Sequence, residues 1–291
     1  MDIYERQINW LFRSAEHFYP ACRMVVITDL ETGFDNVIHE RLQGRIEIFR
    51  AQAPGSGAML SRAQAQVEWL EHEETNGASQ NDPVLLLDSD MLINGRMEEL
   101  RAAHYDVALT YRSHRKMPIN GGAFIIGPGK RLPALVFSRW VEGIYKERFA
   151  DDLWYGHQMA LIEAAGRREF EQSKKTSLTA MRPASAPADD APVHLSLLSV
   201  DEWNRTVDVE LLSLAGIRRA RILHFKGPRK KLMEAYFNGF LAPRPTVGSQ
   251  MGFYLYGMGY TTRKKLARRV RRIWNRLDRS KSKMKGTSQD S

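Results

Sequence analysis

The first 240 residues alternate between short apolar runs and longer segments whose apolar positions recur at helical spacing. The short runs predict strands at 23–29, 45–49, 83–88, 105–110, 121–127, 193–200 and 220–225. Helical spacing predicts helices at 2–19, 59–74, 97–103, 130–149 and 153–165. Strands that alternate with helices predict an α/β fold, here a mostly parallel twisted sheet flanked by helices. Ligands of such sheets bind beyond the carboxyl ends of the strands.

The pattern also divides the chain. We expect a catalytic domain over 1–240, an aromatic connector over 241–260, a basic amphipathic helix over 261–279 and a disordered tail over 280–291. Within the domain, residues 173–192 are poor in apolar side chains and rich in Ala, Pro and Ser, which predicts a mobile loop.

Composition and charge indicate the compartment of the protein and the part of the chain that is basic. The chain has 291 residues and one cysteine, Cys22, so it forms no intrachain disulfide and fits a reducing compartment. The amino-terminal segment carries charges throughout and does not have the pattern of a signal peptide. The net charge is +9, but residues 261–291 hold twelve Lys or Arg against two Asp. The rest of the chain therefore has a net charge of −1, and the basicity belongs to the tail.

The tail has its own pattern. Residues 261–279 place apolar side chains on one helical face and fill the remainder with Lys and Arg; the apolar residues are Leu266, Val270, Ile273, Trp274 and Leu277. Such a helix suits an anionic membrane surface, which predicts a cytoplasmic protein held peripherally on the cytoplasmic face of a membrane. The alternative is a helix that packs on the body with a solvated charged face. Nucleic-acid binding is not expected, because the body adds no basic surface.

One short motif suggests chemistry. The predicted strand at 83–88 ends in Asp-Ser-Asp, and in an extended chain Asp88 and Asp90 point to the same side. Two hard oxygen ligands in this geometry suit Mg²⁺ or Mn²⁺, and such an ion in turn suits a diphosphate. The alternative is a strand end whose aspartates cap the next turn.

Three further motifs follow in the chain. Asn-Gly-Gly at 120–122 lets the backbone approach a ligand before a buried strand, although a simple turn would have the same pattern. Gly156 precedes a predicted helix that carries Gln158 in its first turn. The strand at 220–225 delivers His224 to its carboxyl end, and four cations follow around a Gly-Pro turn. An imidazole followed by lysines can complete a metal shell and bind phosphate oxygens.

In this order, D-x-D, N-G-G, G-x-Q and H-x-x-G-x-x-K resemble the metal-dependent GT-A glycosyltransferases. In particular, they resemble family 8 and its relatives, retaining enzymes that use nucleoside-diphosphate sugars. The resemblance covers about residues 1–235. It implies a GT-A-like fold, Mn²⁺ (or Mg²⁺) as cofactor, a nucleoside-diphosphate sugar as donor with UDP favoured, and a glycan or lipid-linked acceptor.

The resemblance also implies roles for single residues. Asp90 would be the firmer metal ligand, Asp88 would lie nearer the ribose, and His224 would be the third ligand. The residues implied in donor binding are Asp88, Lys226, Gly227, Lys230 and, on the helix before the metal strand, Arg62. Those implied on the sugar or acceptor side are Asn120, Gly121, His157 and, beside the anomeric carbon, Gln158.

Two departures keep other functions open. The family opens with a strand that holds the nucleoside base, whereas this chain begins inside the following helix, and His157 stands where relatives often carry an acid. One alternative is therefore a non-catalytic, membrane-associated protein on a decayed transferase fold. Another is a haloacid-dehalogenase-type phosphatase, which also ends a strand on D-x-D. That class expects the pair on its first strand and Thr or Val at the position of Leu92.

Overall fold

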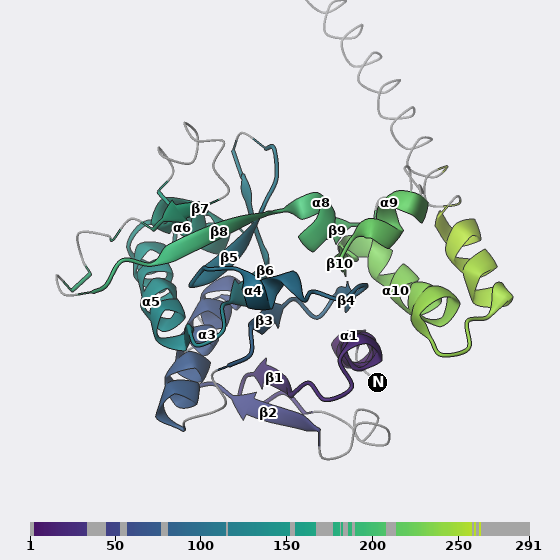
Figure 1. Cartoon of the computed structure of the whole chain (residues 1–291), viewed down its shortest axis with the longest axis horizontal. Coiled ribbons are helices and arrows are strands. Elements are labelled where there is room, and N and C mark those ends of the chain that lie inside the picture. The colour runs from purple at the N-terminus through teal and green to yellow at the C-terminus, as the bar shows by residue number, and fades with distance from the viewer. Residues whose placement is uncertain are drawn as a thin grey trace, which may run out of the picture.

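The computed structural model describes residues 3–33, 45–52, 57–76, 81–114, 116–151, 155–166, 177–180, 182, 186–187, 190–207, 214–257, 259 and 262 (Figure 1). Its α-helices are α1 (Ile3–Phe18), α3 (Ala58–Thr75), α4 (Glu99–Ala102), α5 (Arg131–Arg148), α6 (Gly156–Ala164), α8 (Val200–Trp203), α9 (Leu214–Arg219) and α10 (Leu232–Tyr236). A 3₁₀ turn, η2 (Gly227–Lys231), precedes α10, and a π-helical turn, η3 (Phe237–Leu241), follows it.

The strands are β1 (Met24–Thr28), β2 (Ile46–Arg50), β3 (Val84–Leu87), β4 (Met91–Ile93), β5 (Val107–Tyr111), β6 (Ile119–Ile126), β7 (Ser177–Thr179), β8 (His194–Ser199), β9 (Arg205–Thr206) and β10 (Ile222–His224). Every strand and helix predicted within residues 1–240 overlaps an observed element of the same type. The predicted α/β fold with helices flanking the sheet is therefore confirmed.

The main sheet differs from the prediction in its strand directions. Among the described strands it has the order β3-β6-β5-β8-β7, and only β5 and β8 pair in parallel. The predicted mostly parallel sheet is thus a mixed sheet. The connection from β5 to β6 spans only residues 112–118, which is too short for a crossover and forces antiparallel pairing. Strands β3, β5 and β8 still share one direction, so their carboxyl ends lie at one edge.

Two hydrophobic clusters cover the two faces of this sheet. One cluster joins α3, α5 and α6 to alternate residues of the central strands, including Val107 and Phe124. The other joins α1, β4, β10 and α10 to the intervening residues, including Ala108 and Ile125. Since successive side chains of a strand point to opposite faces, this division follows directly from the near-continuous apolar runs in the sequence.

Two smaller sheets complete the described strands. Strands β1 and β2 pair in parallel, and β10 lies between β4 and β9. The antiparallel pairing of β10 with β4 places His224 opposite Met91, directly after the Asp-Ser-Asp motif. Among the described strands, β1 pairs with β2 alone and β3 with β6 alone.

The Asn-Gly-Gly segment forms an irregularity in β6. Leu109 pairs with Phe124, and the next residue of β5, Thr110, pairs with Asn120. Three residues of β6, 121–123, therefore have no partner on β5 and bulge from the ladder. The bulge brings the two glycines toward the carboxyl end of β3.

Some sequence predictions need correction or fall outside the described residues. The predicted loop over 173–192 contains β7, which pairs antiparallel with β8. The connector predicted over 241–260 contains a helix at 247–257. The predicted basic helix at 261–279 and the tail at 280–291 lie, except for Thr262, outside the described residues. Within the part of the chain that is described, no helix has both the length and the apolar character needed to cross a bilayer.

The helix at 247–257 is fastened to the body through Phe253. This side chain is fully buried and contacts the rings of Tyr236 and Phe240, with ring centroids 5.4 and 5.7 Å away. On the opposite side of the same helix, the side chains of Val247, Met251 and Leu255 are 71%, 57% and 57% exposed. The helix is thus apolar both toward the body and toward solvent.

We expect Phe253→Ala to lower the free energy of unfolding by about 3–5 kcal/mol, because it leaves a cavity in the aromatic cluster. Urea unfolding followed by circular dichroism measures the change. Met251→Ala, on the exposed face of the same helix, is the matched control and should change stability by less than about 0.5 kcal/mol. Equal effects of the two substitutions would contradict the described packing.

Candidate metal and diphosphate site

The two aspartates and His224 converge at the end of β3. The chain turns after Leu87, and the backbone N–H of Phe225 donates to the carbonyl oxygen of Asp90 at 2.8 Å, which extends the pairing of β10 with β4. His224 Nε2 lies 3.0 Å from Asp90 Oδ1 and 3.7 Å from Asp88 Oδ2. One potential ligand atom from each of the three residues lies within 4.8 Å of the others. The predicted metal triad is therefore brought together.

The triad fits a divalent cation. Carboxylate oxygens with one imidazole nitrogen form a donor set that Mn²⁺ accepts and Mg²⁺ tolerates. The space beside the triad depends on Gly122, because a Cβ at this position would lie 2.7 Å from His224 Cε1 and 2.8 Å from Asp88 Oδ2. Only glycine leaves room for an ion and its ligands here.

Positive charge surrounds the two carboxylates. Lys230 Nζ lies 3.4 Å from Asp90 Oδ2. Burial alone would raise the pKa of Asp90, but the hydrogen bond with His224 and the charge of Lys230 outweigh it and lower the pKa. Burial and, next, the charge of Arg112 lower the pKa of Lys226, while Asp88 and Asp90 oppose this shift. Lys230 therefore contacts the triad, and Lys226 is near enough to both aspartates to interact with their charges; diphosphate binding by the two lysines stays a prediction.

Arg62 reaches the same site from α3. Its Nη1 lies 2.7 Å from Asp88 Oδ1, and its Nη2 donates to the carbonyl oxygen of Gly121 at 2.9 Å. Arg62 thus links the first aspartate of the motif to the bulge of β6. Gly227, at the start of η2, has φ +57°, a left-handed conformation that glycine adopts without strain. Arg62 therefore lies beside the triad, and Gly227 begins the turn that carries Lys230, while the part of both residues in donor binding stays a prediction.

The residues predicted on the sugar side line the bulge. Asn120 is buried, and its Oδ1 accepts a hydrogen bond from the N–H of Gly122 at 3.3 Å. Gln158 approaches Gly121, since a Cβ there would lie 3.6 Å from Gln158 Cγ. The buried Oε1 of Gln158 has no hydrogen-bond partner among the described residues. The bulge and α6 thus hold a polar atom that a ligand could satisfy.

His157 lies behind the bulge rather than in open space. It is buried, and its Nδ1 would lie 3.4 Å from a Cβ on Gly121. Burial and, to a lesser extent, the charge of Arg62 lower its pKa from 6.5 to about 3. The imidazole is therefore neutral at physiological pH, and its part in acceptor binding stays a prediction.

The buried His157 predicts a pH-dependent loss of stability. Because its pKa is lower in the folded state, the unfolded chain takes up the extra proton, and stability falls as the pH drops below 6.5. Between pH 7 and pH 5, wild type should lose about 2 kcal/mol more than His157→Gln, which cannot take up that proton. Urea unfolding at both pH values measures the difference. Equal losses in the two proteins would show that His157 is accessible to protons in the fold.

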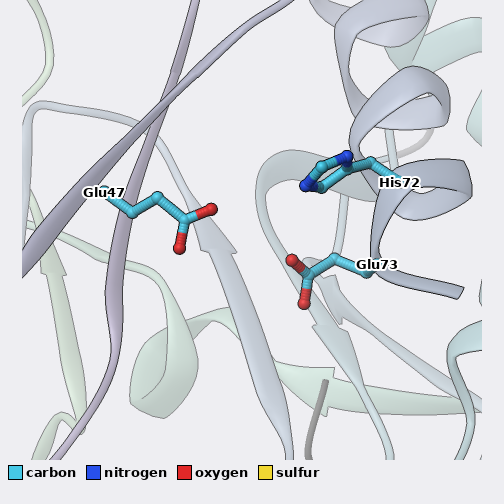
Figure 2. A group of neighbouring side chains, drawn as sticks. All are labelled: Glu47, His72 and Glu73. Atoms are coloured by element: carbon cyan, nitrogen blue, oxygen red, sulfur yellow. The ribbon is translucent and has the colours of Figure 1, made fainter. Parts of the chain in front are cut away.

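A second group of potential metal ligands is neutralised by an arginine. Glu47, His72 and Glu73 come from β2 and α3 and turn toward one another in Figure 2. Arg23 bridges both carboxylates, with Nη2 2.6 Å from Glu47 Oε2 and Nη1 2.6 Å from Glu73 Oε2. The guanidinium already supplies the positive charge that an ion would bring. This cluster therefore fastens β1 and β2 to α3, and it serves below as a control.

The sequence interpretation missed two polar residues at the site, Thr110 and Asn204. Both are fully buried, and Asn204 contacts His224 directly. Thr110 lies inside an apolar strand and Asn204 in a short connection, so neither belongs to a recognisable spacing. Their only sequence signal is a polar side chain, at the end of the predicted strand 105–110 for Thr110 and shortly after the predicted strand 193–200 for Asn204.

Comparisons with known proteins gave structural neighbours alone. No protein-family model matches the chain, and no curated protein matches its sequence. A glycosyltransferase involved in glycosylating the major capsid of PBCV-1 aligns over 79% of this chain and 92% of its own, at 12% identity and a TM-score of 0.48.

Two further solved glycosyltransferases align at similar levels. GlyE of Streptococcus pneumoniae TIGR4 has 14% identity and a TM-score of 0.47, over 77% of this chain and 52% of its own. The galactosyltransferase LgtC, with donor and acceptor sugar analogues, has 13% identity and a TM-score of 0.45, over 78% of this chain and 85% of its own. At these scores the likeness extends to no particular residue or activity of this chain.

Proposed function

We propose that this protein is a metal-dependent glycosyltransferase that moves a sugar from a nucleoside diphosphate to an acceptor hydroxyl. The observation that carries the proposal is the convergence of Asp88, Asp90 and His224 beside two lysines. Two carboxylates and an imidazole suit a divalent cation, and the lysines suit the phosphate oxygens of a diphosphate bound to it. No other arrangement in the described residues joins a metal site to a cationic turn.

The difficult event in this reaction is departure of the nucleoside diphosphate. A bound Mn²⁺ or Mg²⁺ would neutralise negative charge that develops on the leaving diphosphate. Lys230 and Lys226 would donate charge-assisted hydrogen bonds to the same oxygens, each contributing about 1.5–3 kcal/mol. Gly227 lets the backbone of η2 come close to the phosphates, and Arg62 holds Asp88 in place.

The sugar would lie against the bulge of β6. The unpaired Oε1 of Gln158 supports a role for this side chain beside the anomeric carbon, where positive charge builds in the transition state. Asn120 and Gly121 shape the wall on which the sugar or acceptor rests. We propose that the reaction is retaining, as in the family that the motifs resemble, with a glycan or a lipid-linked saccharide as acceptor. Since the described residues offer no evident enzymic nucleophile at this point, retention would proceed by same-face attack of the acceptor.

Thermal unfolding with nucleoside diphosphates tests this proposal. We expect UDP with Mn²⁺ to stabilise the protein, by about 2.7 kcal/mol at a ligand concentration 100 times its dissociation constant, and UDP without metal to have little effect. His224→Ala should abolish the stabilisation, because it removes one ligand of the triad. His72→Ala, in the arginine-neutralised cluster, should retain it.

Other outcomes of this experiment have a clear meaning. Absence of a shift with every nucleotide and metal would contradict the transferase site and favour a decayed one. Hydrolysis of phosphomonoesters without transfer would favour the phosphatase alternative. An Asp90→Ala variant that retains full transfer of sugar would also overturn the proposal.

We further propose that the carboxyl-terminal region docks on an anionic membrane surface on the cytoplasmic side. Val247, Met251 and Leu255 form an exposed apolar stripe on the described helix. The chain that follows carries twelve Lys or Arg between residues 263 and 285. An apolar stripe followed by dense positive charge suits an interface of acyl chains and anionic headgroups. A lipid-linked or envelope glycan acceptor would fit this location.

Sedimentation with vesicles tests the membrane proposal. The protein should sediment with phosphatidylglycerol vesicles at low salt, and less so at high salt or with phosphatidylcholine alone. Replacing both Met251 and Leu255 by Ser should weaken binding at least about tenfold, since full burial of such side chains contributes about 1.5–3 kcal/mol each. Leu132→Ser, equally exposed at 57% but on α5, is the control. Failure of wild type to sediment would refute the docking.

A further inference from the structure

A buried chain of hydrogen bonds leads from the bulge of β6 to His224. The hydroxyl of Thr110 donates to the carbonyl oxygen of Asn120 at 2.8 Å. The amide Nδ2 of Asn204 donates to Thr110 Oγ1 at 2.9 Å. The amide Oδ1 of Asn204 lies 2.8 Å from His224 Nδ1. All four residues are at most 4% exposed, so water does not substitute for these partners.

The chemistry of these groups sets the direction of the chain. The carbonyl oxygen of Asn120 can only accept, so the single hydroxyl hydrogen of Thr110 must point toward it. The hydroxyl oxygen then offers a lone pair, which the Asn204 amide can meet only with its NH₂ group. The amide oxygen of Asn204 is thereby directed at His224. Because this oxygen only accepts, His224 Nδ1 must carry a hydrogen.

With the hydrogen held on Nδ1, Nε2 is the ring nitrogen that can bind a metal. Nε2 is the atom that faces Asp90 at 3.0 Å and Asp88 at 3.7 Å. A histidine that binds a metal through one nitrogen is held in its tautomer by an acceptor at the other. An unfixed imidazole would spend part of its time with the hydrogen on Nε2, where it blocks the ion.

We propose that Asn204 and Thr110 are positioning residues that lock His224 in the Nδ1–H tautomer and so present Nε2 to the divalent ion. This inference rests on the proposed function, since it assumes that the triad binds a metal. The chain of hydrogen bonds begins at the bulge, because the carbonyl oxygen that sets its direction belongs to Asn120, next to the two glycines of the site. The metal ligand and the backbone wall for the sugar are thus held by one network.

A role in packing alone makes a different prediction. The side chains of Thr110, Asn204 and His224 also satisfy one another's polar groups. If that were their only role, removing one would lower stability without a specific effect on metal affinity. Thr110→Val separates the two roles, because valine matches the shape of threonine but has no hydroxyl to accept from Asn204. The Asn204 amide is then free to turn, and its NH₂ group can face His224 Nδ1. Thr110→Ser keeps the hydroxyl and is the matched control.

The first measurement is the affinity of the full chain for Mn²⁺ by isothermal titration calorimetry. Thr110→Val should bind Mn²⁺ about 10- to 100-fold more weakly than wild type, as is typical when the outer partner of a metal-binding histidine is lost. Thr110→Ser should bind within about threefold of wild type if the hydroxyl is what matters. Asn204→Leu, which removes the acceptor itself, should weaken binding at least as much as Thr110→Val. Circular dichroism without metal confirms that each variant is folded.

The second measurement observes the tautomer directly. Nitrogen-15 NMR of histidine-labelled, metal-free protein, at a pH at which the ring is neutral, distinguishes a ring nitrogen that bears hydrogen from one that does not, and His224→Gln identifies the signal. Wild type and Thr110→Ser should show hydrogen on Nδ1, whereas Thr110→Val should show a mixture or the opposite tautomer. A purely structural role would leave these signals unchanged in all folded variants.

The outcomes separate this inference from the proposed function. If wild type and His224→Ala bind Mn²⁺ equally, or wild type binds none, the metal site and the inference both fail. If wild type binds Mn²⁺ through His224 and Thr110→Val binds equally well with an unchanged tautomer, the inference alone fails.

Discussion

The antiparallel pairing of β4 with β10 is the constraint on which the site depends. It sets Met91 opposite His224 and so places an imidazole against two aspartates that lie far from it in the sequence. The pairing is buried between α1 and the aromatic cluster around Tyr236, so the hydrophobic effect that drives this packing also brings the polar groups together. The carboxylates of Asp88 and Asp90 would repel each other more strongly if the cationic side chains of Arg62 and Lys230 did not lie beside them.

The same arrangement explains why the site is compatible with folding before an ion binds. Arg62 pairs with Asp88, and Lys230 lies near Asp90, so neither carboxylate is left without a positive partner. These contacts involve partly exposed side chains, which can turn toward a diphosphate without exposing the core. On the proposed function, the protein would replace one set of charge contacts by another when a diphosphate binds.

The sequence predicted the parts of the site that follow from strand ends. Asp88, Asp90 and His224 each follow or end an apolar run, as the sequence shows, although β3 and β10 belong to different sheets and the pairing of β10 with β4 brings the residues together. Mixed strand directions could not be derived from apolar runs, because these runs show that β6 is buried but not which way it runs. Thr110 and Asn204 were missed because their importance comes from a hydrogen bond to a distant residue, and no local spacing encodes such a partner.

The packing of the helix at 247–257 would set the distance between the site and a membrane-bound acceptor. Phe253 anchors the helix on Tyr236, whose hydroxyl donates to Asn94 Oδ1 at 2.6 Å, immediately after β4. A short series of contacts therefore joins the helix that carries the exposed apolar stripe to the strand that follows the aspartate pair. With the stripe seated in a bilayer, the site would stand at a fixed height above the lipid. The length of the spacer between the lipid and the acceptor sugar would then determine which acceptors reach the metal site.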